Sequence, residues 1–159
     1  SPARASVPSD GTYDCNTGLP SDATPNFTIS AGSVSGGETC VGAVVIPEGV
    51  ISFAAFAFYA GSPANRNWTS ITFPDSLTST GLYALAYATN LTTITFPANF
   101  TSIGEAGFYN TQNLCSVYFL GNAPSVGADV FKRGGGNCDN PQVFIQSGAV
   151  GFPAPGSRW

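Results

Sequence analysis

A unit of 23 residues recurs along this chain, and this repetition constrains the fold more than any other feature. Residues 68–90 and 91–113 pair over their full length without a gap. The matching positions carry large apolar side chains, proline or glycine: Ile71 with Ile94, Phe73 with Phe96, Pro74 with Pro97, Leu77 with Phe100, Gly81 with Gly104 and Leu85 with Phe108. A fixed period of between about 20 and 50 residues indicates a solenoid, in which each repeat forms one coil stacked on the next.

The repeat extends in both directions from this pair. Residues 41–67 carry the same apolar pattern with an insertion at Gly61–Arg66, and residues 114–131 continue it in a decayed form. We therefore expect one structural domain. It would consist of an N-terminal leader and cap, four repeats and a C-terminal cap, at 1–40, 41–67, 68–90, 91–113, 114–131 and 132–159.

Each repeat begins with a segment that favours a β-strand. Apolar and hydroxyl residues alternate in Thr93–Phe96, so an extended chain directs Ile94 and Phe96 to one face and the threonines to the other. Pro97 ends the strand because it has no N–H to donate, and Gly104 allows a tight corner. A single coil cannot bury its large side chains alone, so the coils must stack. An aromatic ligand cage is the alternative, but recurrence in every coil favours a core.

The order of these positions resembles the motif of a known family. The motif comprises Leu91, Ile94, Phe96, Pro97, Phe100, Ile103, Gly104, Gly107 and Phe108. It resembles the BspA-like leucine-rich repeat over roughly Val41–Phe131, although Thr80 and Leu85 replace the usual aliphatic residue and phenylalanine. The resemblance implies a right-handed curved solenoid with a parallel sheet on one side. It also implies a setting on microbial surfaces or in secreted adhesive proteins, without enzymatic activity.

Four cysteines indicate two disulfides, because their number is even, none lies in a Cys-x-x-Cys motif and the chain has no histidine. Disulfides in turn indicate an oxidising compartment, outside the cell or at its surface. Cys115 and Cys138 lie one repeat apart, which places them on adjacent coils at about 5 Å, close to what a disulfide requires. Cys15 and Cys40 flank the other end. We predict the pairs Cys15–Cys40 and Cys115–Cys138, each stapling a terminal coil, in preference to a metal site.

The segments outside the repeats are expected to form caps. Ser1–Pro25 is rich in Ser, Pro, Asp and Gly and is predicted to be a loop-like leader, flexible enough to reach a neighbouring molecule. Phe27–Ser30 and Ser33–Gly37 are predicted as strand and turn of the N-terminal cap. Gln142–Ile145 is expected to be a final strand in step with the repeats, and Gly151–Trp159 an irregular C-terminal cap.

The predicted fold class follows from these elements. It is mostly β, a short right-handed leucine-rich-repeat solenoid with a parallel sheet of about five to six strands and short helical or irregular convex segments. Disulfide-stapled caps close its two ends.

Charge and composition exclude several classes of partner. The chain carries 5 basic and 9 acidic residues with a net charge of −4, which makes nucleic acid a poor partner. It has no run of about eighteen apolar residues, so no membrane span is expected. Ala3-Arg4-Ala5 has the form of a signal-peptide cleavage site, and the chain is interpreted as already processed. With so few charges, the surface is either kept soluble by hydroxyl groups or glycans, or it is covered by other copies of the chain. We favour the second explanation.

Residues suited to catalysis are few. Without histidine, acid–base chemistry at neutral pH falls to carboxylates, lysine, cysteine or tyrosine. Glu48 and Asp75 take equivalent positions in turns after prolines, which favours solvated turn sites over a catalytic pair. Oxygen ligands for calcium are available from Asp10, Asp14 and Asn16, but turn acids are the preferred interpretation. We predict no catalytic residues, no cofactor and no metal.

Four N-x-S/T sequons mark candidate glycosylation sites, at Asn26, Asn67, Asn90 and Asn99. The repeat itself explains two of them, because it places asparagine before its leading apolar residue at Asn67 and Asn90. Glycosylation therefore stays open at this stage.

The outward face of the predicted sheet is the candidate binding surface. Stacked coils align hydroxyl-bearing and aromatic side chains in two rows, formed by Ser70, Thr72, Thr93, Thr95, Ser116 and Tyr118. Such a face could bind a partner chain, a glycan or an ice lattice. The simpler explanation is that exposed strand positions favour threonine for its β-branched side chain.

Two functions are compatible with these features. The first is an extracellular, non-catalytic structural or adhesive module that associates with itself head-to-tail, as a subunit of a surface filament or matrix. The second is a monomeric cell-surface adhesin that binds a host protein or glycan through the threonine-lined face.

Overall fold

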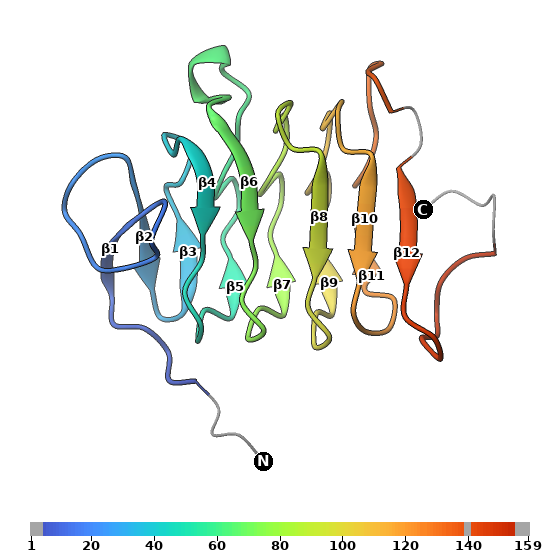
Figure 1. Cartoon of the computed structure of the whole chain (residues 1–159), viewed down its shortest axis with the longest axis horizontal. Coiled ribbons are helices and arrows are strands. Elements are labelled where there is room, and N and C mark those ends of the chain that lie inside the picture. The colour runs from blue at the N-terminus through green and yellow to red at the C-terminus, as the bar shows by residue number, and fades with distance from the viewer. Residues whose placement is uncertain (1–4, 139–140, 155–159) are drawn as a thin grey trace.

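The computed structural model describes residues 5–138 and 141–154, which form twelve strands and a 3-10 turn. Longer strands at the front alternate with shorter ones behind, and successive coils stack along the long axis of the molecule (Figure 1). The elements are β1 (Gly11–Asp14), β2 (Asn26–Ser30), β3 (Ser33–Ser35), β4 (Gly42–Val45), β5 (Ser52–Phe53), η1 (Pro63–Asn65), β6 (Trp68–Thr72), β7 (Ser79–Thr80), β8 (Thr93–Phe96), β9 (Ser102–Ile103), β10 (Ser116–Phe119), β11 (Ser125–Val126) and β12 (Gln142–Ile145). The described part is mostly β without an α-helix, which confirms the predicted class of a parallel β-solenoid.

The front face consists of β4, β6, β8, β10 and β12, one strand per coil (Figure 1). Paired strands run parallel, and residues one repeat apart lie opposite each other, as Ile94 does with Val117. In β8 the buried Ile94 and Phe96 alternate with the exposed Thr93 and Thr95. The two-residue period read from the sequence is therefore the physical alternation of a half-buried strand.

A second sheet lies behind the first and was not predicted from the sequence. Its strand order is β1-β2-β3-β5-β7-β9-β11, antiparallel in the first two pairings and parallel thereafter. The strands from β5 onward have two residues each, such as Ser102–Ile103. Two residues are too few to show an alternating pattern, so only the stacking of coils reveals this sheet.

The core fills the space between the two sheets. Phe96 is fully buried at its centre, with ring centroids 4.7 Å from Phe100, 4.9 Å from Phe119, 5.6 Å from Phe108 and 5.7 Å from Phe73. These aromatic residues come from consecutive coils, as expected for a repeat that buries its large side chains only against its neighbours.

The N-terminal leader is more ordered than predicted. Gly11–Asp14 forms β1, which pairs antiparallel with β2, so the prediction of a loop is wrong for this segment. Tyr13 is buried against Phe27, and its hydroxyl donates a hydrogen bond to the Ser9 carbonyl oxygen at 2.7 Å. The local sequence contains little apolar pattern because the strand is stabilised by a partner more than ten residues away.

The C-terminal strand also departs from strict periodicity. Gln142 lies opposite Ser116, a separation of 26 residues where the repeat has 23, so β12 is out of step by three residues. Phe152 packs on Phe119 at 5.2 Å within the predicted C-terminal cap, whose last residues, 155–159, lie outside the described ranges.

Both predicted disulfides are present. Cys15 pairs with Cys40 at the N-terminal end, with Cα atoms 5.7 Å apart, and Cys115 pairs with Cys138 at 5.3 Å. The second pair joins adjacent coils across one repeat, as the period predicted. The exact division into caps and repeats stays a prediction.

Candidate functional site

The six residues predicted to form a binding face lie on three front strands. They are Ser70 and Thr72 on β6, Thr93 and Thr95 on β8, and Ser116 and Tyr118 on β10. The serines are half-buried and the other four are exposed. Tyr118 stacks on Phe144 of β12, with ring centroids 4.6 Å apart, so its ring is engaged by its neighbour on the same face.

The ladder of the front face is interrupted between β6 and β8. β4 pairs with β6, and β8 pairs with β10, but no strand pairing joins β6 to β8 in the described chain. Ring packing differs at the same place. Phe96 and Phe119 stack at 11° and 4.9 Å, close to strand spacing, whereas Phe73 and Phe96 meet at 44° and 5.7 Å. The predicted hydroxyl rows are thus divided into two blocks.

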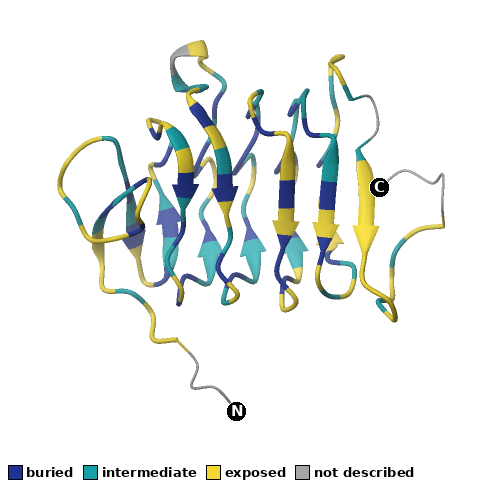
Figure 2. Cartoon of the chain, viewed as in Figure 1, coloured by how far each residue is buried: buried dark blue, intermediate teal, exposed yellow. Residues whose placement is uncertain are grey.

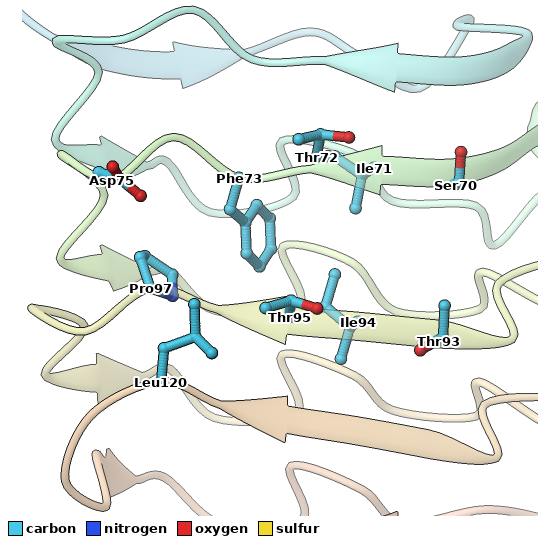
Figure 3. A pocket seen from close by; sticks show the side chains of 10 residues that line it. All are labelled: Ser70, Ile71, Thr72, Phe73, Asp75, Thr93, Ile94, Thr95, Pro97 and Leu120. Carbon is cyan, nitrogen blue, oxygen red and sulfur yellow. The ribbon is translucent and has the colours of Figure 1, made fainter. Parts of the chain in front are cut away.

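A groove of about 310 Å³ occupies this interruption. Its lining combines residues of β6 and β8 with residues that follow β6, β8 and β10, namely Ser70, Ile71, Thr72, Phe73, Asp75, Thr93, Ile94, Thr95, Pro97 and Leu120. Figure 3 shows the side chains of Ile71 and Phe73 between the two ribbons, with Ile94 on the β8 ribbon. Four of the six predicted face residues therefore line one groove, while the two on β10 do not.

One end of the groove is acidic. Asp75 lines it, and its backbone N–H donates a hydrogen bond to Oε1 of Glu48 at 3.0 Å. The two carboxylates are exposed and lie on adjacent coils, in the equivalent turn positions noted from the sequence. Lys132 and Asp129 form an ion pair elsewhere on the solenoid, away from these two carboxylates.

A cluster of aromatic rings was missed by sequence reasoning. It consists of Phe56, Tyr59, Tyr83, Tyr87 and Tyr109, with neighbouring centroids 5.3–6.3 Å apart. These residues lie on the segments that return from the back strands to the front strands. Arg66, at the end of the insertion, lies 6.0 Å from the Tyr87 ring and donates to the Ala60 carbonyl oxygen at 3.0 Å. The cluster thereby holds the insertion against the coils.

The ring cluster has an unusual backbone conformation and a shifted tyrosine pKa. Phe56, Tyr83 and Tyr87 have φ values of 60°, 51° and 62°, a conformation that costs a non-glycine residue about 1–2 kcal/mol. Desolvation raises the pKa of Tyr87 above its usual value, and Tyr109 and the other nearby phenols add to this shift while Arg66 opposes it. The recurrence of aromatic residues in each return segment was the available signal.

The candidate glycosylation sites occupy different environments. Asn67, Asn90 and Asn99 are exposed, and Asn26 is half-buried with its amide donating to the Ala23 carbonyl oxygen at 3.1 Å. The Asn90 amide donates to the Arg66 carbonyl oxygen of the preceding coil at 2.6 Å. This hydrogen bond between coils explains why the repeat places asparagine here, whether or not the site is glycosylated.

The described residues offer no alternative centre of metal chemistry. They contain no group of three cysteine, aspartate or glutamate side chains placed to hold an ion. Asp14 instead accepts hydrogen bonds from the backbone N–H groups of Asn16 and Thr17, and Asp10 accepts one from Ala31. Across 5–138 and 141–154, no helix has the length and apolar character needed to cross a membrane.

Comparison with known proteins agrees with the repeat geometry. The model of the BspA type leucine-rich repeat region matches residues 36–140 in six copies, a range that includes every strand from β4 to β11. Searches of curated proteins and of solved structures found no match. Because the family match covers more than half of the chain and coincides with its stacked coils, this protein belongs to the BspA-type leucine-rich repeat family.

Proposed function

We propose that this chain is an extracellular, non-catalytic module that associates with a second copy of itself at the C-terminal end of the solenoid. Repeats of this family are typical of surface modules that mediate protein–protein interaction and are typically non-catalytic. The two disulfides are consistent with an extracellular location.

The exposed final strand is the observation that carries the proposal. Val143, Phe144 and Ile145 of β12 expose 50%, 42% and 49% of their surface (Figure 2). Val117 and Phe119, the partners of Val143 and Ile145 on β10, are by contrast buried. Within the described residues, β12 pairs only with β10, so its outer edge presents unpaired N–H and C=O groups. An apolar strand with a free edge is suited to pairing with another chain.

The opposite end of the front face is covered. Asn16 donates from Nδ2 to the carbonyl oxygens of Val41 and Ala43 at 2.8 and 2.7 Å, and Val45 N–H donates to Cys15 O at 2.8 Å. The outer edge of β4 is therefore occupied by its own chain. Contact between two open ends uses the same surface twice and gives a closed two-fold pair. The head-to-tail filament expected from the sequence stays a prediction and has less support than this pair.

Light scattering over a concentration series tests the proposal. The parent chain should approach twice its 16.3 kDa mass at tens of micromolar, and the double variant Val143→Lys/Ile145→Lys should remain at one chain mass. Thr95→Lys adds charge to the front face instead and should leave the dimer intact. A parent that stays monomeric, or a double variant that still dimerises, would contradict the proposal; open-ended filaments in electron micrographs would favour head-to-tail packing.

A second function is favoured by the groove between β6 and β8. Ser70, Thr72, Thr93 and Thr95 line one concavity with an apolar base, which suits binding of a partner protein or glycan through the threonine-lined face. Thr72→Arg or Thr95→Arg should then abolish ligand binding and leave the oligomeric state unchanged. The groove contains no residue of β12, so the two functions can be tested independently.

A further inference from the structure

We infer that the ring cluster contains a modification site, at which oxidation of the Tyr87 and Tyr109 phenols forms a covalent dityrosine cross-link. The link joins the coil of residues 68–90 to the coil of residues 91–113, and neither disulfide involves a residue of these two coils. The ring cluster contains no residue of the groove or of β12, so the inference is independent of both functions above.

The backbones of the two tyrosines lie side by side on adjacent coils. The Tyr87 N–H donates a hydrogen bond to the Tyr109 carbonyl oxygen at 2.7 Å. The two ring centroids are 5.5 Å apart and the ring planes are inclined at 61°, whereas the other tyrosine pairs of the cluster are 5.6–6.3 Å apart. Because the rings are already in contact, rotation about the side-chain bonds can bring together the carbon atoms beside their hydroxyls without separating the coils.

The tyrosines of the cluster are also within reach of an oxidant. Four of the six tyrosines of the chain belong to it and are half-buried, namely Tyr59, Tyr83, Tyr87 and Tyr109. The other two have different surroundings: Tyr13 is buried, and Tyr118 stacks on Phe144. A radical that forms on one ring of the cluster can pass to the next because neighbouring rings are in contact. The cluster therefore provides several entry points for oxidation and one closest pair for coupling.

The coupling reaction needs an external oxidant, and hydrogen peroxide used by a haem peroxidase supplies it. Each phenol loses one electron and one proton, and the two phenoxyl radicals form a carbon–carbon bond beside their oxygens. The ring hydrogens at these carbons then move to the oxygens and restore two phenols, so the product lacks two hydrogen atoms. Peroxide takes up the two electrons and two protons and gives two molecules of water. The oxidising compartment that the disulfides indicate suits this chemistry.

The cross-link adds a staple between the two disulfides. Cys15–Cys40 and Cys115–Cys138 lie at opposite ends of the repeats. The coils between them are held by core packing and by backbone hydrogen bonds such as that from Tyr87 to Tyr109. A covalent link at this place restricts the unfolded chain, as a disulfide does, and thereby stabilises the central coils.

Limited oxidation of the full chain tests the inference. The chain is treated at low micromolar concentration with a haem peroxidase and one equivalent of hydrogen peroxide, and the single-chain product is isolated by size-exclusion chromatography. Cleavage after glutamate cuts at Glu105, which places Tyr87 in the fragment 49–105 and Tyr109 in the fragment 106–159. We expect the two fragments to stay joined after disulfide reduction, with a mass two hydrogen atoms below their sum. The uncleaved product should melt at a higher temperature than the untreated chain.

Matched variants separate this site from general oxidation of tyrosine. Tyr87→Phe and Tyr109→Phe keep the ring but remove the phenol, and each should prevent the joining of the fragments. Tyr83→Phe and Tyr118→Phe change one tyrosine in each of the same two fragments and should leave the joining intact. Fragments that separate, joining that survives Tyr87→Phe or Tyr109→Phe, or a cross-linked product found only at twice the chain mass would each overturn the inference.

Discussion

Thr80 is a polar residue in an otherwise apolar row of the core. It pairs in register with Phe53 on one side and Ile103 on the other, and only 3% of its surface is exposed. Its hydroxyl is buried and has no hydrogen-bond partner among the described atoms. A buried donor without a partner lowers stability by about 1–3 kcal/mol.

Thr80→Val should therefore raise the free energy of unfolding by about 1 kcal/mol, since it replaces the hydroxyl by a methyl group of similar size. Urea unfolding followed by circular dichroism measures the change. Thr95→Val, at an exposed position of β8, serves as the matched control and should shift stability by less than about 0.5 kcal/mol. A loss of stability in Thr80→Val would mean that the hydroxyl is satisfied.

The environment of Tyr87 predicts that the stability of the fold decreases at alkaline pH. Desolvation and three neighbouring tyrosines raise the pKa of Tyr87 in the folded state above its usual value, so the folded chain holds this proton more tightly than the unfolded chain. The stability contributed by this group is complete below the unfolded pKa and falls as pH rises through the folded pKa. Unfolding measured between about pH 9 and 11 should show this decline, and Tyr87→Phe should lessen it. An identical decline in both proteins would rule out Tyr87 as its source.

Glycine acts between elements in this solenoid, at the corners that follow the short back strands β7, β9 and β11. A Cβ on Gly104 would lie 2.5 Å from the carbonyl carbon and 2.7 Å from the carbonyl oxygen of Gly81, and a Cβ on Gly127 would meet Glu105 in the same way. Gly104 does not have a positive φ. The tight corner expected at Gly104 therefore depends on the close approach of one coil to the next and not on a left-handed backbone.

Gly104→Ala should destabilise the protein by about 1–3 kcal/mol, because the contacted atoms are backbone and the coils must separate to admit the methyl group. Gly134→Ala is the control: a Cβ there lies 3.8 Å from its nearest neighbour, so its effect should stay within about 0.5 kcal/mol. Denaturant unfolding compares the two variants. Equal stabilities would show that the coils do not depend on this approach.

The whole molecule has two unequal ends. At the N-terminal end, β1 and β2 extend the back sheet beyond β3, and Cys15 and Cys40 are fully buried. At the C-terminal end, Cys115 and Cys138 are half-buried and β12 exposes its apolar residues. Within the described residues, the solenoid is thus covered at one end and exposes an apolar strand at the other, and this exposed strand is the place that we propose for association.

Removal of the Cys15–Cys40 disulfide should test this asymmetry. Cys15→Ala/Cys40→Ala should lower the free energy of unfolding by about 2–4 kcal/mol through the lost cross-link, plus a cavity term because both sulfurs are buried. Cys115→Ala/Cys138→Ala removes a disulfide of similar loop length, 23 residues against 25, from a less buried site and should cost less. Equal losses, measured by urea unfolding under identical conditions, would contradict a difference between the two ends.

Prediction from sequence succeeded for features that follow directly from the repeat pattern. The alternation in Thr93–Phe96 predicted a half-buried strand, and a separation of one period predicted that Cys115 faces Cys138. Prediction was incomplete where contacts join segments that do not share a sequence pattern. β1 depends on β2 for its pairing, and the ring cluster around Tyr87 forms only when the return segments of successive coils meet.

The candidate groove shows the same division. The sequence placed the hydroxyls of Ser70, Thr72, Thr93 and Thr95 on one outward face, because side chains alternate along a strand and repeat between coils. The break in the ladder between β6 and β8 coincides with the tilted packing of Phe73 on Phe96 across coils. Ring tilt is set by neighbours on every side, so no local pattern encodes it.

The amino-acid sequence by itself determined the stacked coils, the buried row of each strand and the Cys115–Cys138 pair, because each follows from a period of 2 along a strand or of 23 between coils. The Cys15–Cys40 pair was predicted from the two remaining cysteines, which flank the other end. The tertiary structure alone decided the second sheet, the covered N-terminal end, the exposed β12 edge and the groove. These features arise where the coils differ from one another, and their energies depend on contacts between residues that no shared period relates.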